Sequence, residues 1–142
     1  MKFSTKTRYG LRAMLEIAYH SPSSGVYQKD IAQNQGISNK YLDHIIHALK
    51  ASELIVNVKG KKSGYILTRE PSQISIYDIH NAFEPGICVI DCLSKSINCD
   101  REEGCAAKGF WGGLNKTIVD YFKSVSLENL MHNEAILDDI VL

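Results

Sequence analysis

Residues 27–69 constrain the fold of this chain more than any other part of it. A short helix is predicted at 28–35, and Gly36 follows it, the residue type that most often ends a helix. Ser38 is suited to be the N-cap of a further helix, which runs to about Ser52. Two short helices joined by a tight turn are typical of a helix-turn-helix, whose second helix enters the major groove of DNA.

The helix predicted from 39 to 52 has an apolar and a polar face. The apolar stripe consists of Tyr41, Leu42, Ile45 and Leu49, and the polar face of Asn39, Lys40, Asp43, His44 and His47. We expect Lys40 to contact phosphate, and we expect Asn39, Tyr41 and His44 to contact base edges or phosphate. The predicted contacts on this side also include Gln28 and Ser38. For the two histidines, plain solvation is the alternative.

A β-hairpin with a basic loop is predicted next. Runs of β-forming residues at 54–58 and 65–68 flank the segment 59–64, which is rich in lysine and glycine. Lysines neutralise phosphates, and small residues let a loop approach a groove. The residues expected to contact DNA here are Lys59, Gly60, Lys61 and Lys62. A three-helix scaffold with an ordinary solvated hairpin is the alternative reading of the same pattern.

The remaining segments are predicted to be mainly helical. A first helix is expected at 4–20, another at 74–83, and a long last helix at 110–125. The expected fold is therefore mostly α with a small β-hairpin wing: a winged helix-turn-helix plus a long C-terminal helix. We divide the chain into a DNA-binding domain at 1–84, a cysteine-rich loop at 85–108, and the last helix with its tail at 109–142.

Four cysteines fall within eighteen positions after this winged helix. They are Cys88, Cys92, Cys99 and Cys105. Thiolates are ligands of iron–sulfur clusters and of zinc. Zinc sites usually pair their cysteines as Cys-x2-Cys, whereas here six residues separate Cys92 from Cys99 and five separate Cys99 from Cys105. This spacing favours a cluster over structural zinc, with a thiol–disulfide switch or inert cysteines as further alternatives.

The charge distribution agrees with a DNA-binding first half. The formal net charge is zero, but residues 1–70 hold 11 Lys and Arg against 5 Asp and Glu, a net of +6. Residues 71–142 hold 5 against 11, a net of −6. A basic half that coincides with a helix-turn-helix pattern indicates a nucleic-acid surface.

The composition and the motifs exclude several classes of protein. No apolar run approaches the roughly 20 residues of a membrane span, and no apolar signal stretch is visible near the start. We therefore expect a cytoplasmic protein with no membrane partner, in which clustered cysteines bind metal rather than form disulfides. No nucleophile–base constellation, phosphate-binding glycine loop or dinucleotide fingerprint is present, so we do not expect an enzyme.

Several short motifs together resemble a known family. They are the opening Ser4–Met14, Ile31-Ala32, Gly36-Ile37-Ser38, Tyr41-Leu42, the wing from Val58 to Tyr65, and Ser126–Leu130. In combination, over nearly the whole chain, they are similar to the IscR/NsrR/CymR-type winged-helix regulators of bacteria, the Rrf-two superfamily. The resemblance implies a homodimer with one winged helix per subunit and a pseudo-palindromic operator on double-stranded DNA.

The resemblance also implies that the last helix mediates dimerisation. Its stripe is too apolar for a lone surface helix and suits that role. The stripe consists of Trp111, Leu114, Ile118, Tyr121, Phe122 and Val125.

Family members with cysteines in this loop resemble sensors that hold a [2Fe-2S] or [4Fe-4S] cluster on three cysteines. Cys92, Cys99 and Cys105 match these ligands, and we favour [2Fe-2S]. The positions at which members carry a further ligand hold Lys108, Arg8 and Arg12 here. Arginine cannot ligate iron at neutral pH. Cys88 is therefore the best candidate for the fourth ligand, followed by Asp91 or a small exogenous ligand.

We therefore expect a transcription regulator, a repressor, that senses cluster status, nitric oxide or redox state through a cysteine-ligated iron–sulfur cluster. The alternative is a zinc-bound or metal-free regulator of the same fold that answers to a metabolite or a partner protein.

Overall fold

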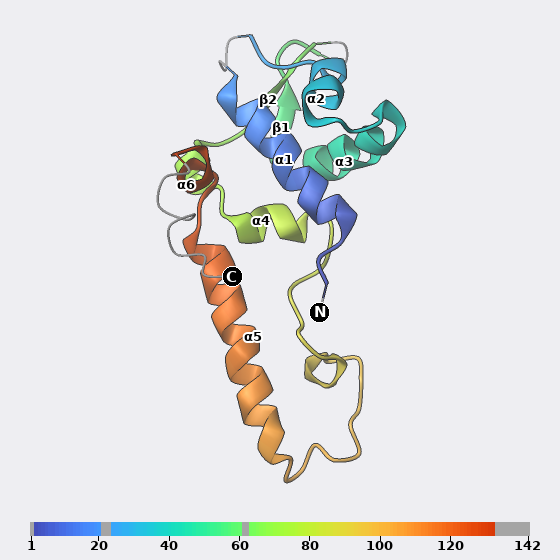
Figure 1. The fold of residues 1–142 in the computed structure, drawn as a ribbon, viewed down its shortest axis with the longest axis vertical. Coiled ribbons are helices and arrows are strands. Elements are labelled where there is room, and N and C mark those ends of the chain that lie inside the picture. Colours follow the sequence, from blue (N-terminus) through green and yellow to red (C-terminus); the bar gives the residue numbers. More distant parts are fainter. Residues whose placement is uncertain (1, 21–23, 61–62, 133–142) are drawn as a thin grey trace.

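The computed structural model describes residues 2–20, 24–60 and 63–132, and it is mainly helical (Figure 1). The helices are α1 Thr5–Tyr19, α2 Gln28–Gln35, α3 Asn39–Ala51, α4 Ile76–Asn81, α5 Ala106–Ser124 and α6 Leu127–His132, and the 3-10 turns are η1 Pro71–Gln73 and η2 Asp91–Leu93. Strand β1 Ile55–Asn57 pairs antiparallel with β2 Tyr65–Leu67. The predicted mostly-α fold, a winged helix with a long helix towards the C-terminus, is confirmed.

The winged-helix head, residues 4–83, is built around α1. Ala13, Met14 and Ile17 of α1 are buried, and α2, α3, α4 and the hairpin contribute side chains to the same core. The buried members from these other elements, from their connections and from α6 are Val26, Ile31, Ala32, Ile37, Leu42, Ile45, Ile46, Leu49, Leu54, Ile55, Ile74, Ile79 and Leu127. Because burial of apolar surface is the main driving force of folding, this one cluster holds the head together.

The turn between α2 and α3 forms as the sequence predicts. Gly36 has a φ of 62° and a ψ of 38°, the left-handed conformation that glycine adopts without steric cost. The amide of Ile37 donates to the carbonyl of Ala32 over 3.0 Å, which completes the end of α2. The hydroxyl of Ser38 accepts a hydrogen bond from the amide of Tyr41 over 3.2 Å and caps α3.

The hairpin is held to the head by a contact between distant segments. Val26, just before α2, forms an antiparallel bridge with Tyr65 of β2 through hydrogen bonds of 3.0 and 2.8 Å. The backbones approach so closely that Gly64 has no room for a side chain: a Cβ there would lie 2.8 Å from the amide nitrogen of Val26.

The expected boundaries of α4 and α5 were wrong by a few residues. α4 begins at Ile76 rather than at Ile74, because Ser75 and Asp78 form a reciprocal capping box. The backbone at Ile74 is extended and accepts a hydrogen bond from a later segment. α5 begins at Ala106 rather than at residue 110, since alanine is the strongest helix former and the helix tolerates the glycines that follow.

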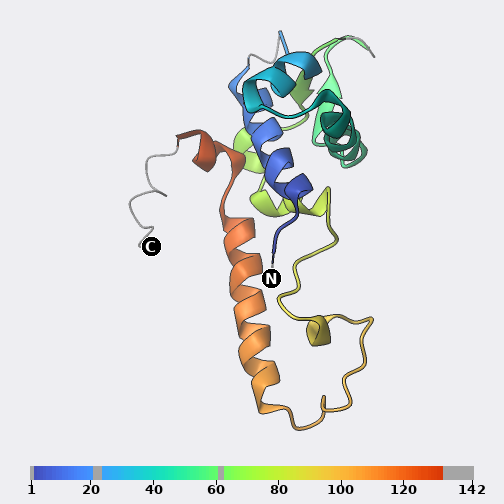
Figure 2. The ribbon, with the colours of Figure 1, turned by 45° about the vertical axis from the view of Figure 1, so that its right-hand side comes forward.

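Helix α5 extends away from the head, and the segment that connects it to α4 runs out to its far end (Figures 1 and 2). We call residues 85–105 the cysteine loop. The near end of α5 is anchored by backbone pairing: the amide of Ile76 donates to Val125, and the amide of Leu127 donates to Ile74. Leu127 is completely buried, and α6 returns to pack on α1. None of the helices in the described ranges is long and apolar enough to cross a bilayer.

The close contact at Gly64 gives a prediction about stability. Changing Gly64 to Ala should lower the free energy of unfolding by about 2 kcal/mol, because the new methyl group meets backbone that cannot move aside. Urea-induced unfolding measures this change. Gly109→Ala is the control, since a Cβ there meets nothing within 4 Å and should be neutral or stabilising. Equal stability of the wild type and Gly64→Ala would contradict the close contact.

Candidate functional site

The polar face of α3 is exposed, as its sequence predicts. Asn39, Lys40 and His44 are all accessible, and the opposite face is buried in the core. Asn39 and Lys40 are the first residues of the helix, directly after the Ser38 cap. A helix start that is fixed by a cap and carries exposed amide and ammonium groups is the part of a recognition helix that contacts DNA.

Three other predicted contact residues make bonds within the chain. Tyr41 is half-buried, and its ring stands edge-on to Tyr9 at 5.7 Å. The hydroxyl of Ser38 is engaged in the cap. Gln28, at the start of α2, donates a hydrogen bond to the carboxylate of Asp43 on α3. Gln28 therefore joins α2 to α3, Tyr41 packs α3 against α1, and Ser38 fixes the start of α3.

The tip of the wing is shaped by Ser63, a residue that the sequence analysis did not single out. Its hydroxyl accepts from the amide of Lys59 and donates to the carbonyl of Gly60, both over 2.8 Å. Gly60 has a φ of 88°, which favours glycine. Lys59 and Gly60 are exposed, as expected of wing contacts, whereas Lys61 and Lys62 lie outside the described residues.

Lys50 connects α3 to the wing. Its ammonium donates to the side chain of Asn57 on β1 over 2.9 Å and lies 5.8 Å from the centre of the Tyr65 ring. Asn57 in turn donates to the carbonyl of Ser63 over 3.0 Å. This chain of contacts holds the wing in one orientation beside α3, and no local sequence pattern indicated it.

The four cysteines are free, but the structure does not gather them into one site. Cys88 and Cys105 are exposed, and Cys92 and Cys99 are half-buried. Within the described ranges, no three residues of the types His, Cys, Asp and Glu lie close enough to hold a metal ion. Cys88 does not lie one helical turn before Cys92, because the 3-10 turn begins only at Asp91. The Cys88 thiol donates to the carbonyl of Ile90.

Lys108 lies beside two of the expected ligands. The Lys108 ammonium forms an ion pair with Glu102. This hydrogen bond raises the pKa of Lys108, and the charges of Glu102, Cys92 and Cys105 add to the increase. The same hydrogen bond lowers the pKa of Glu102. Lys108, in the first turn of α5, therefore places a positive charge beside Glu102 of the cysteine loop.

The apolar stripe of α5 divides into two parts. Leu114 and Tyr121 are exposed, 38% and 57% respectively, and α5 contains no buried residue. Trp111 and Ile118 are half-buried. Phe122 instead stacks on Phe3 of the same chain at 5.2 Å, and the carbonyl of Val125 belongs to the backbone pairing with the head.

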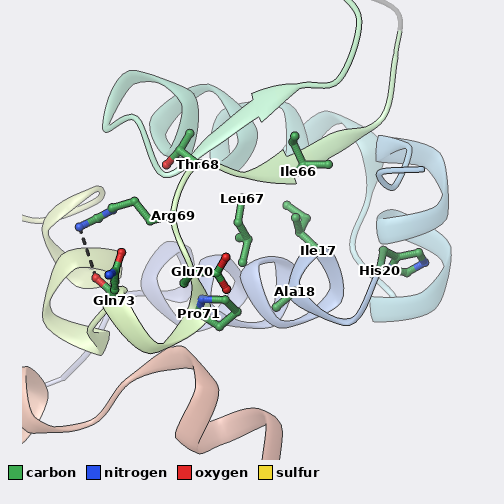
Figure 3. Close-up of a pocket in the computed structure, with 10 residues that line it drawn as sticks. All are labelled: Ile17, Ala18, His20, Ile66, Leu67, Thr68, Arg69, Glu70, Pro71 and Gln73. Atoms are coloured by element: carbon green, nitrogen blue, oxygen red, sulfur yellow. Dashed lines mark hydrogen bonds between the residues drawn. The ribbon is translucent and has the colours of Figure 1, made fainter. Parts of the chain in front are cut away.

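A groove lies between the end of α1 and the segment after β2 (Figure 3). Its lining includes Ile17, Ala18, His20, Ile66, Leu67, Thr68, Arg69, Glu70, Pro71 and Gln73. Arg69 donates to the carbonyl of Gln73 over 3.4 Å and lies 3.9 Å from the Asp78 carboxylate. The hydroxyl of Thr68 donates to the carbonyl of Glu53. These contacts of Arg69 and Thr68 stabilise the head.

The chain is similar to proteins of one regulator family. The Rrf2 model, described as an iron-dependent transcriptional regulator, matches residues 3–133. The HTH-type transcriptional regulator IscR of Xenorhabdus nematophila is 32% identical over 138 residues, 97% of this chain and 84% of that protein. Protein rrf2 of Nitratidesulfovibrio vulgaris is 33% identical over 136 residues, 96% of this chain and 91% of that protein.

Solved structures of the same kind have the same fold. CymR, the global cysteine regulator of B. subtilis, superposes with a TM-score of 0.80 at 29% identity, over 94% of this chain and 98% of that one. IscR of T. potens gives a TM-score of 0.74 at 31% identity, over 100% of this chain and 93% of that one. These relatives are transcriptional regulators, a class of proteins that are generally not enzymes.

Proposed function

The chain belongs to the Rrf2 family of transcriptional regulators, and on that premise we propose that it is a homodimeric repressor controlled by an iron–sulfur cluster on its cysteine loop. DNA-binding transcriptional regulation is the common property of its relatives. The proposal adds the operator, the dimer and the signal: cluster status, nitric oxide or redox state. The observation that carries it is the exposed, capped polar face of α3 beside the wing, on the same chain as four free thiols.

In the proposed complex, α3 lies in the major groove. Asn39 and His44 would contact base edges, and Lys40 would contact phosphate. The wing would bring Lys59 and Gly60 to the backbone next to the groove. Support comes from their exposure and from the Lys50–Asn57 contact, which keeps the wing beside α3.

We also propose that α5 pairs with α5 of a second copy. An exposed apolar stripe on a helix that projects from the head marks an interaction surface. The stripe residues that would meet the partner are Trp111, Leu114, Ile118 and Tyr121. A dimer with two-fold symmetry presents two recognition helices, which suits a pseudo-palindromic operator.

The donor set fits an iron–sulfur cluster in its chemistry. Four free thiols on a polar, accessible segment are the soft ligands that such clusters take, and the family is described as iron-dependent. Cys92, Cys99 and Cys105 would hold the cluster, with Cys88 or Asp91 as the fourth ligand, and [2Fe-2S] is favoured over [4Fe-4S]. When bound, the cluster supplies iron whose oxidation state and integrity respond to oxidants and nitric oxide.

A metal-free or zinc-bound regulator is the second candidate function. One observation favours it: the fold matches that of a cysteine regulator, CymR, with a TM-score of 0.80. In that case the loop would answer to a metabolite or a partner protein.

Metal analysis separates the two candidates. After purification without oxygen, we expect iron with matching sulfide and the visible absorption of thiolate-ligated iron. Replacing Cys92, Cys99 or Cys105 by Ala should remove most of the iron, and Cys88→Ala reports on the fourth ligand. Zinc alone, or no metal after attempted reconstitution, would rule out the cluster. The proposal that the chain binds DNA would still stand.

Salt dependence tests the DNA interface. In titrations of a mixed-sequence duplex, Lys40→Ala and Lys59→Ala should each flatten the slope of log affinity against log salt by about 0.9 for each phosphate that is no longer neutralised. Lys116→Ala is the control, because Lys116 pairs with Asp120 on α5, outside the head. An unchanged slope in Lys40→Ala would place α3 outside the interface.

The oligomeric state tests the role of α5. Leu114→Glu should convert the dimer to a species with the mass of one chain, 15.9 kDa, in sedimentation equilibrium. Burying an unpaired carboxylate in the interface costs roughly 3 kcal/mol or more. Lys116→Glu, a change on the polar side of the same helix, should stay dimeric. If the wild type itself sediments as a single chain, α5 is not a dimerisation helix at that concentration.

A further inference from the structure

A buried histidine stands where the head, α5 and the cysteine loop meet. His80, in the last turn of α4, is only 2% exposed. Its ring is edge-on to Phe3 at 5.7 Å and to Phe122 at 5.8 Å, and these two phenylalanines stack on each other. The three rings come from the segment before α1, from α4 and from α5, so the histidine joins these three parts of the chain.

The hydrogen bond of His80 goes to the first turn of the cysteine loop. Its Nε2 lies 2.8 Å from the carbonyl oxygen of Gly86. A carbonyl oxygen only accepts hydrogen bonds, so Nε2 carries the proton and donates it. The neighbouring Asn81 side chain accepts from the amide of Gly86 over 3.1 Å. His80 and Asn81, in the last turn of α4, therefore bind the carbonyl and the amide of Gly86, which lies two positions before Cys88.

Gly86 is a turning point of the backbone. Its φ of 67° lies in the left-handed region, which a side chain would strain. The two hydrogen bonds from α4 hold the chain in this conformation, and they set the direction in which the cysteine loop leaves the head.

The other ring nitrogen, Nδ1, makes no contact in the described part of the chain that would favour a histidine at this position over an apolar ring. Within the described residues, His80 Nδ1 is buried and has no hydrogen-bond partner. Burying a polar atom without a partner is unfavourable, and an apolar ring would fill the same space without that penalty. The Glu84 carboxylate lies 3.9 Å from Nε2, on the side of the ring that already bonds to Gly86. What remains to explain the histidine is its bond to Gly86.

The end of α4 is also connected, through α1, to the helix-turn-helix. Phe83, just after α4, lies against Gly10 of α1 so closely that a Cβ on Gly10 would be 2.2 Å from its ring. Further along α1, Arg12 donates to the side chain and the carbonyl of Gln35, and Glu16 accepts from Gln35 over 2.8 Å. Gln35 is the last residue of α2. These contacts connect the end of α4 through α1 to the end of α2, the first helix of the helix-turn-helix.

We propose that His80 is a positioning residue that fixes the start of the cysteine loop to the winged-helix head through its Nε2–H donor to Gly86. The proposal rests on the proposed function only in taking the cysteine loop as the sensing element. The positioning itself is a property of the metal-free, reduced chain, so it is tested without any cluster.

Two substitutions separate the hydrogen bond from the packing of the ring. His80→Phe keeps an aromatic ring between Phe3 and Phe122 and removes the donor. His80→Gln removes the ring and keeps an N–H at the same number of bonds from the backbone. His47→Phe, at an exposed position on α3, is the matched control for the chemical change.

The measurement is hydrogen–deuterium exchange of the full chain, metal-free and reduced, read on peptides that cover residues 84–92. His80→Phe should raise exchange there by about fivefold, the equilibrium factor for the loss of one ordinary hydrogen bond. His80→Gln should restore slow exchange, and His47→Phe should match the wild type.

Each other outcome overturns the proposal. Wild-type exchange in His80→Phe would show that the bond to Gly86 does not hold the loop. Equally fast exchange in His80→Phe and His80→Gln would show that ring packing, not the donor, is what matters. Exchange on peptides of α1 distinguishes a local effect from global unfolding, because a folded head keeps α1 protected in every variant. An iron-free protein would disprove the cluster and leave this result unchanged.

Discussion

The packing of α1 is the constraint on which the rest of the structure depends. The hairpin, α2, α3, α4 and α6 all pack on this helix, and its inward side is completely buried. Gly10 sets the distance to α4, since the ring of Phe83 occupies the place of a side chain. A helix that packs against so many other elements can shift only if several of them shift with it. The recognition helix and the attachment point of the cysteine loop are therefore parts of one packed body, although they lie far apart in the sequence.

The sequence predicted best what local chemistry decides. The bounds of α2, the glycine turn and the Ser38 cap were all correct, because capping groups and glycine conformations act within three or four residues. α5 begins four residues earlier than predicted, because Ala106 and Ala107 favour a helix and extend it into the end of the predicted cysteine-rich loop. The bridges Val26–Tyr65 and Ser75–Ser126 could not be predicted, because they join segments that have no common pattern.

In the candidate sites too, features set by local sequence were predicted, whereas features set by tertiary contacts were not. Exposure of Lys40 and His44 follows from helical periodicity, and it was predicted. The role of Lys50, the closure of the wing by Ser63 and the burial of His80 depend on tertiary contacts, and no spacing indicated them. The arrangement of the cysteines stays a prediction, because the loop that carries them lacks a core of its own. Its shape depends on its attachments at the two ends.

The way α5 is fixed has a mechanical consequence. The helix has 19 residues, so it is about 28 Å long at 1.5 Å per residue. Its C-terminal end is joined to the head by the pairing at Ile74, Ile76, Val125 and Leu127, while Cys105 sits at the opposite end. α5 is thus attached to the head at its C-terminal end, and any rotation about that attachment moves its N-terminal end furthest. A rotation of about 10° at the attachment would move the far end by about 5 Å over that length. A displacement of about 5 Å at Cys105 therefore corresponds to a turn of only about 10° where α5 meets the head.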